Sequence, residues 1–169
     1  MKARFFHRAR VRAPIAVAWD VFTDHERIGE FTNTDMKIVE PGNPERNELG
    51  CVREIETLGW KVVEIVNYWE PLKSFGYHVF GGTVLTHHQG IVRFFSTSEQ
   101  GTEWVYDMQN VPTESSIAQA KAAGYPDWQT FIYPEFRNYM ADLEAECERR
   151  AASTLIAALP LAVSERGLR

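Results

Sequence analysis

The chain begins with an alternation of apolar and polar positions. Between Phe5 and Val11, apolar or weakly polar residues alternate with Phe6, Arg8 and Arg10. A period of two is typical of a strand with one face in water. The segment PIAVAWDVFTD follows, and its proline suits a first helical turn. We therefore expect a first strand followed by two short helices, at about 14–24 and 26–32.

The middle of the chain has the pattern of an antiparallel sheet. Between residues 34 and 110, strand-like runs are separated by the turn signals PGNPERNELG, LGW, EPLKS, GGT and TSEQG. Sequential hairpins are the simplest interpretation of this order. Together with the first strand, they predict a curved antiparallel sheet of about seven strands.

The last third of the chain contains the clearest helical pattern. After Pro134, the residues Phe136, Met140, Leu143 and Cys147 recur at steps of three and four. Residues 113–131 contain proline and glycine and are expected to form an irregular connection. We predict one α+β domain over 1–169, with the C-terminal helix over 134–158 and a tail over 160–169.

Cross-strand pairing predicts which side chains face this helix. If Leu58 and Gly59 form a hairpin turn, Arg53 faces Glu64 among apolar residues. The same alternation can be followed through the later hairpins, where it turns the charged residues outward. The predicted inner face includes His7, Tyr68, Phe75, Tyr77, Val79, Val84, Thr86, His88, Gly90, Val92, Phe94, Thr102, Trp104, Tyr106 and Met108.

This inner face has the composition of a ligand pocket. Pockets combine apolar and aromatic walls with a few placed polar groups, whereas a packed core rarely buries an arginine and a glutamate. The predicted ligand-binding residues are Arg53, Glu64, Tyr68, Tyr77, Thr86, His88, Phe94, Trp104, Tyr106, His7, Met140 and Leu143.

Each polar candidate has a structural interpretation beside the functional one. Arg53 and Glu64 either grip a carbonyl or enolate of a ligand or hold the hairpin together. His88 either transfers protons beside Tyr77 or is a hydrogen-bonded wall residue. The aromatic residues either stack on a flat ligand or fill the core. His88, Tyr77 and Arg53 are the candidate catalytic residues. No metal site is expected, because His87 and His88 point to opposite faces of a strand.

Composition narrows the possible partners. A net charge of -5 disfavours nucleic acid and anionic membrane surfaces. Two distant cysteines and a start without a signal-peptide core favour a cytoplasmic protein. The longest nearly uncharged stretch, 151–163, is shorter than the roughly 20 apolar residues needed to span a bilayer, so no membrane insertion is expected.

Several segments together resemble a known superfamily. They are APIAVAWDVFTD, Gly50-Cys51-Val52-Arg53, VVEIVNYWEP, SFGY, GTEWVYDM and the terminal amphipathic helix. This pattern is similar to the START and birch-pollen-allergen superfamily, often called SRPBCC, in its polyketide cyclase/dehydrase and lipid-transport branch. The resemblance implies a helix-grip fold with an internal cavity that takes lipids, polyketides, hormones or other hydrophobic molecules. It implies no cofactor, and in some members the bound polyketide is cyclised or aromatised.

Three hypotheses about function remain open. The first is binding of a small hydrophobic or aromatic molecule with one polar end near Arg53 and Glu64. The second is a cofactor-independent cyclase, aromatase or dehydratase. The third is a protein-interaction module, in which Leu155, Ile156 and Leu159 dock on a partner or form a homodimer.

Overall fold

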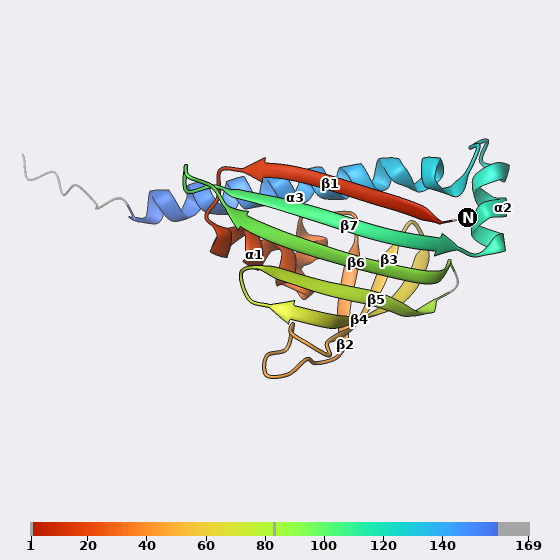
Figure 1. Ribbon diagram of the computed structural model, residues 1–169, viewed down its shortest axis with the longest axis horizontal. Helices are drawn as coiled ribbons and strands as arrows, with labels where there is room; N and C mark the ends of the chain where they lie inside the picture. The colour runs from red at the N-terminus through yellow and green to blue at the C-terminus, as the bar shows by residue number, and fades with distance from the viewer. Residues whose placement is uncertain (1, 83, 159–169) are drawn as a thin grey trace, which may run out of the picture.

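The computed structural model describes residues 2–82 and 84–158. Within them, a 7-stranded antiparallel sheet has the order β1-β7-β6-β5-β4-β3-β2. The strands are β1 (Ala3–Val11), β2 (Asp35–Glu40), β3 (Val52–Thr57), β4 (Trp60–Glu70), β5 (Ser74–Gly82), β6 (Leu85–Ser96) and β7 (Thr102–Pro112). The helices are α1 (Ile15–Thr23), the 3-10 helix η1 (His25–Glu30), α2 (Glu114–Ala122) and α3 (Trp128–Ala158). In Figure 1, α3 runs lengthwise along the sheet, with α1 and α2 towards opposite ends. This is the predicted helix-grip architecture.

The β3–β4 hairpin has the predicted register. Leu58 and Gly59 have φ angles of 53° and 73°, so both central turn residues adopt the positive φ of a tight hairpin. Glycine meets this requirement without steric cost. The turn places Arg53 opposite Glu64, as expected from the sequence.

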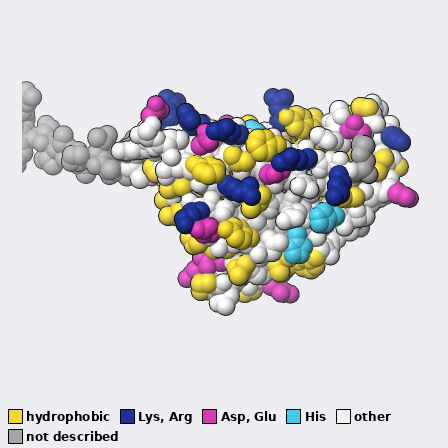
Figure 2. Space-filling model, viewed as in Figure 1, with side chains coloured by type: hydrophobic (Ala, Val, Ile, Leu, Met, Phe, Trp, Pro, Cys, Tyr) yellow, Lys and Arg dark blue, Asp and Glu magenta, His cyan; other side chains and the backbone are white. Residues whose placement is uncertain are grey.

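The arginines of β1 point away from α3, as predicted. Arg4 pairs with Asp107 at 2.8 Å and Arg8 with Glu103 at 2.7 Å on the neighbouring strand. Exposed pairs of this kind contribute little to stability. On the face shown in Figure 2, Lys and Arg side chains lie beside Asp and Glu side chains, with hydrophobic side chains between them.

Two predicted inward residues lie outside, so those predictions were wrong. The β4–β5 register shifts between Val66 and Tyr68, and the β6–β7 register shifts between Leu85 and His87. Each irregularity reverses the alternation of the strand. Tyr68 is 44% exposed as a result, and Thr86 is exposed as well.

The connection before the long helix is more regular than expected. The predicted irregular segment 113–131 contains α2, whose first turn is capped by the Thr113 hydroxyl, which accepts from the Ser116 N–H at 3.3 Å. α3 begins at Trp128 instead of 134, because the Asp127 carboxylate accepts from the Thr130 N–H at 2.7 Å and starts the helix earlier. Pro134 therefore lies inside the helix.

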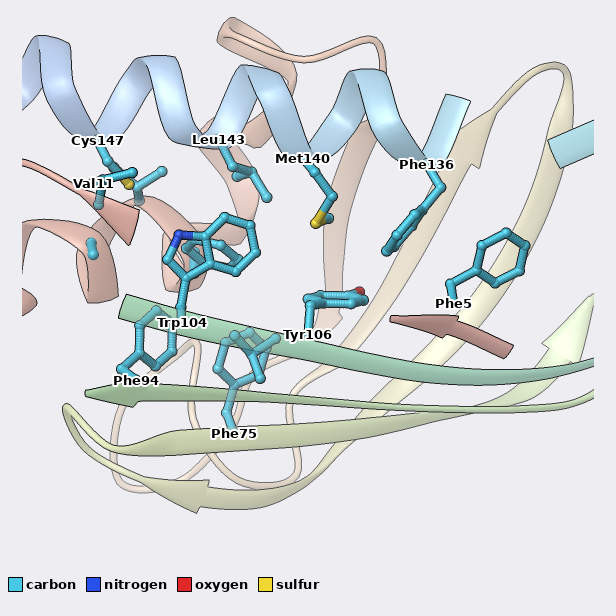
Figure 3. Close-up of a cluster of buried hydrophobic side chains, with 14 of the residues drawn as sticks. Phe5, Val11, Phe75, Phe94, Trp104, Tyr106, Phe136, Met140, Leu143 and Cys147 are labelled. Atoms are coloured by element: carbon cyan, nitrogen blue, oxygen red, sulfur yellow. The ribbon is translucent and has the colours of Figure 1, made fainter. Parts of the chain in front are cut away.

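The predicted apolar stripe of α3 packs on the sheet. Met140, Leu143 and Cys147 have no exposed surface. Figure 3 shows these side chains pointing to the sheet, where Trp104 and Tyr106 point back at them. The side chains of Leu155 and Ile156, together with residue 159 and the predicted tail 160–169, lie outside the part of the chain that the structure describes.

Candidate functional site

A cavity of about 180 Å³ lies between the sheet and the first half of α3. Its apolar wall comes from Met36, Ile55, Val62, Val84, Leu85, Met108 and Ile132, and its aromatic wall from Trp60, Tyr77, Tyr106, Trp128, Phe136 and Tyr139. Its polar lining comes from Thr34, Arg53, Thr57, Glu64, His88, Asn110 and Glu135. The lining is therefore largely apolar with a few polar groups, as in small-molecule sites.

Four of these polar residues form a row across the sheet. Arg53 on β3 is paired with Glu64 on β4, and His88 on β6 is paired with Asn110 on β7. Val79 on β5 joins the two pairs, since it is the register partner of both Glu64 and His88. The side chains of His88 and Glu64 meet across Val79, with Nε2 3.4 Å from Oε1, so the four residues form a polar strip beside the apolar walls.

Arg53 and Glu64 form a buried ion pair within this strip. The Arg53 Nε and Nη2 atoms both donate to Glu64 Oε2, at 3.1 and 2.9 Å. Their side chains are only 4% and 5% exposed. The guanidinium also lies 4.6 Å from the centre of the Tyr77 ring, a cation–π contact. The arginine charge is thus held in place and matched by one carboxylate.

His88 lies beside this pair. Its Nε2 atom is 3.4 Å from Glu64 Oε1, and its ring stacks on Tyr77 with centroids 5.3 Å apart. Burial lowers the pKa of His88, while the Glu64 charge and the Asn110 side chain oppose that shift more weakly. The imidazole is therefore neutral near pH 7, with one nitrogen able to donate and the other to accept.

Several buried polar atoms in the cavity have no hydrogen-bond partner among the described residues. They are Nδ1 of His88, Oδ1 of Asn110 and Nε1 of Trp128, while Nε2 of His88 has only the 3.4 Å approach to Glu64 Oε1. A buried polar atom without a partner costs about 1–3 kcal/mol, and most buried polar atoms in folded proteins have one. These donors and acceptors are therefore available to a polar group of a ligand.

Two tyrosines complete the floor of the cavity. The hydroxyls of Tyr77 and Tyr106 contact each other, and burial raises the pKa of Tyr106 well above its ordinary value. Burial also raises the pKa of Tyr139, on the α3 side, to about 12. All three groups line the cavity, and Tyr106 and Tyr139 are neutral phenols at neutral pH.

The predicted site residues divide into three groups. The cavity is lined by Arg53, Glu64, Tyr77, His88 and Tyr106. Four others belong to the hydrophobic core beside the cavity and do not line the cavity, namely Phe94, Trp104, Met140 and Leu143. The remaining three lie elsewhere, since Tyr68 and Thr86 are exposed and His7 Nε2 bonds Glu144 Oε1 on α3 at 2.7 Å.

Sequence reasoning missed part of the cavity. Asn110 continues the inward alternation that runs through Tyr106 and Met108, so a signal for it was present. Trp128 and Ile132 extend the α3 stripe towards the N-terminus at four-residue steps, and they were overlooked because Pro134 was taken as the start of the helix. Tyr139 lies beside the stripe, three residues after Phe136, and was also missed.

No helix within the described residues is long and apolar enough to cross a membrane.

Comparison with known proteins identifies the fold. No model of a known protein family matches the sequence, and no curated protein matches it either. Among solved structures, the chain is similar to a START superfamily protein from Mycobacterium smegmatis, with a TM-score of 0.66 and 11% identity over 89% of this chain and 98% of that one. It is also similar to Ara h 8.0201, with a TM-score of 0.64 and 12% identity over 90% of this chain and 99% of that one. The predicted helix-grip fold is confirmed.

Proposed function

We propose that this chain, which has the helix-grip fold of the START superfamily, binds one small and largely apolar molecule in the cavity under α3. The observation that carries this proposal is the set of unpaired buried atoms on His88, Asn110 and Trp128 inside an apolar cavity. A polar group of a ligand could bond to one or more of these atoms while its apolar body contacts the walls.

The size of the cavity favours a compact ligand. A cavity of about 150 Å³ is enough to bind benzene. The volume here, about 180 Å³, therefore suits a ring compound better than a long acyl chain. Within the lipid-like and polyketide-like classes that the sequence suggests, we place the ligand at the aromatic, polyketide-like end. We expect the protein to meet it in the cytoplasm.

The test is to look for the ligand and then to block the cavity. Native and denaturing mass spectrometry of protein purified from its own host should show one discrete bound mass. Val62 lines the cavity, whereas its neighbour Val63 does not. The substitution Val62→Phe should therefore remove the bound mass, and Val63→Phe on the other face of β4 should retain it. Loss of the mass in neither variant, or equally in both when both melt cooperatively, would contradict binding in this cavity.

A second candidate function is cofactor-independent catalysis, such as cyclisation or dehydration of a polyketide-like substrate. The observation that favours it is His88, because its neutral imidazole lines the cavity, stacks on Tyr77 and lies 3.4 Å from the Glu64 carboxylate. Such a group can take a proton from one substrate atom and return it to another. Arg53 would then stabilise developing enolate charge.

Substitution separates the two functions. If the protein is an enzyme, His88→Gln should abolish product formation and leave ligand affinity nearly unchanged. Product formation that survives in a folded variant lacking the Arg53, Tyr77 and His88 functional groups would rule out this catalytic assignment. Binding without any turnover would leave the first function as the sole one.

A further inference from the structure

The charges that line the cavity determine which ligands it accepts. Among the described residues that line the cavity, Arg53 is the one that carries a positive charge, and its Nε and Nη2 atoms both donate to the same oxygen of Glu64. Glu135 adds a second carboxylate to the lining. His88 adds no charge near pH 7, because burial lowers its pKa. The lining therefore has an arginine that is already neutralised and a surplus of negative charge.

We propose that Glu64 is the specificity-determining residue that makes the cavity select uncharged ligands and reject carboxylates. This inference rests on the proposed function. An anionic ligand group beside the polar strip would lose its hydration and would face the Glu64 carboxylate at close range. An uncharged hydroxyl or carbonyl meets no such penalty, because it can bond to the unpaired atoms of His88 and Asn110.

The same geometry predicts how the cavity changes when Glu64 is replaced by the uncharged glutamine. Glutamine has nearly the shape of glutamate, and its carbonyl oxygen can still accept from the Arg53 guanidinium. The arginine charge, however, is then unmatched in a buried site. A ligand carboxylate can replace the lost charge and form a charge-assisted, two-bond contact with the guanidinium. Glu64→Gln should therefore convert a cavity for neutral ligands into one for anions.

The experiment uses two probes of nearly equal size and shape, naphthylmethanol and naphthoate, which differ in charge. Binding is measured by isothermal titration calorimetry near neutral pH, and each variant is checked for cooperative melting. Wild-type protein should bind naphthylmethanol at least about tenfold more tightly than naphthoate, and Glu64→Gln should raise naphthoate affinity at least about tenfold. The double variant Arg53→Gln/Glu64→Gln should lose that gain, which would identify Arg53 as the anion contact.

The outcomes separate this inference from the proposed function. Equal affinities of wild-type protein for the two probes, or unchanged naphthoate affinity in folded Glu64→Gln, would overturn the selectivity and leave binding intact. Absence of saturable naphthylmethanol binding to wild-type protein would count against the proposed function itself. If Glu64→Gln alone does not fold, the double variant Arg53→Gln/Glu64→Gln decides the matter, because it removes the carboxylate without leaving a buried arginine charge. A smaller preference for naphthylmethanol than in wild-type protein supports the role of Glu64, and an unchanged preference overturns it.

Discussion

The ring of Tyr77 lies directly over Gly90 of the neighbouring strand, and its hydroxyl reaches Tyr106 one strand further on. A Cβ atom at position 90 would overlap the Cζ, Oη and Cε1 atoms of that ring. The missing side chain of Gly90 therefore permits the tyrosine to lie across β6. The Tyr77 ring in turn contacts both the Arg53 guanidinium and the His88 ring, so its position affects both groups.

The substitution Gly90→Ala tests this relationship. Because the added methyl displaces the Tyr77 ring, we expect a loss of about 1–3 kcal/mol of unfolding free energy, typical of overpacking, together with weaker probe binding. Gly81→Ala on β5 is the matched control, since its added Cβ would meet Val63 at 3.4 Å, close to ordinary contact distance. Urea unfolding and calorimetric titration measure the two effects. Equal losses in the two variants would show that the Tyr77 ring is not constrained by Gly90.

The buried Arg53–Glu64 pair makes a second prediction, about stability without ligand. Removing one partner leaves an uncompensated buried charge, so Arg53→Met or Glu64→Leu alone should cost about 3–5 kcal/mol in urea unfolding. The double variant Arg53→Met/Glu64→Leu should recover most of that loss, because an apolar pair of similar volume avoids the cost of removing two charges from water. Losses that simply add would mean that the two side chains do not act as a pair.

The β3–β4 hairpin was predicted residue by residue because its turn has a strong local signal. Gly59 suits the positive φ of a tight turn. The register that this turn sets places two oppositely charged pairs across from each other, Arg53 with Glu64 and Glu56 with Lys61. Five of the predicted ligand-binding residues line the cavity, and they followed from that register and from strict alternation along later strands. The predictions about ligand and catalysis remain untested by the fold, since one fold serves many functions.

The errors came from features that leave little trace in sequence. The register shift near Tyr68 depends on how β4 and β5 pair in the folded sheet, and neither the composition nor the hydrophobic period of the sequence predicts it. The early start of α3 depends on a cap by Asp127, a residue also common in turns. As a result, the first turns of α3 that line the cavity, with Trp128 and Ile132, were absent from the predicted site.

The register shift in β4 makes a third prediction. It turns Tyr68 outward, where it is 44% exposed, and turns Trp69 inward, where its ring lies 4.9 Å from that of Trp19. We expect Tyr68→Ala to change the unfolding free energy by less than about 1 kcal/mol, since surface substitutions have small effects. Trp69→Ala should cost at least about 2 kcal/mol through lost packing. Reversal of this order in urea unfolding would support the alternation predicted from the sequence.

The fourth prediction concerns pH. Burial, with the Arg53 charge as a smaller cause, lowers the pKa of His25 well below its ordinary value of 6.5, and burial also lowers that of His88. The unfolded chain then binds more protons than the folded one below about pH 6.5, so stability is full above that pH and falls as the pH drops. One such histidine contributes up to about 2 kcal/mol of loss between about pH 6.5 and 5.

His25 offers the cleaner test, because it has no exposed surface and does not line the cavity. Replacing His25 by leucine fills a similar volume with an apolar side chain and removes the titrating group. The unfolding free energy of His25→Leu, measured in urea between about pH 7 and 5, should therefore depend less on pH than that of wild-type protein. His87→Gln, a change at an exposed histidine, should keep the wild-type dependence. An identical pH dependence in His25→Leu and wild-type protein would show that protonation of His25 does not drive the loss of stability in acid.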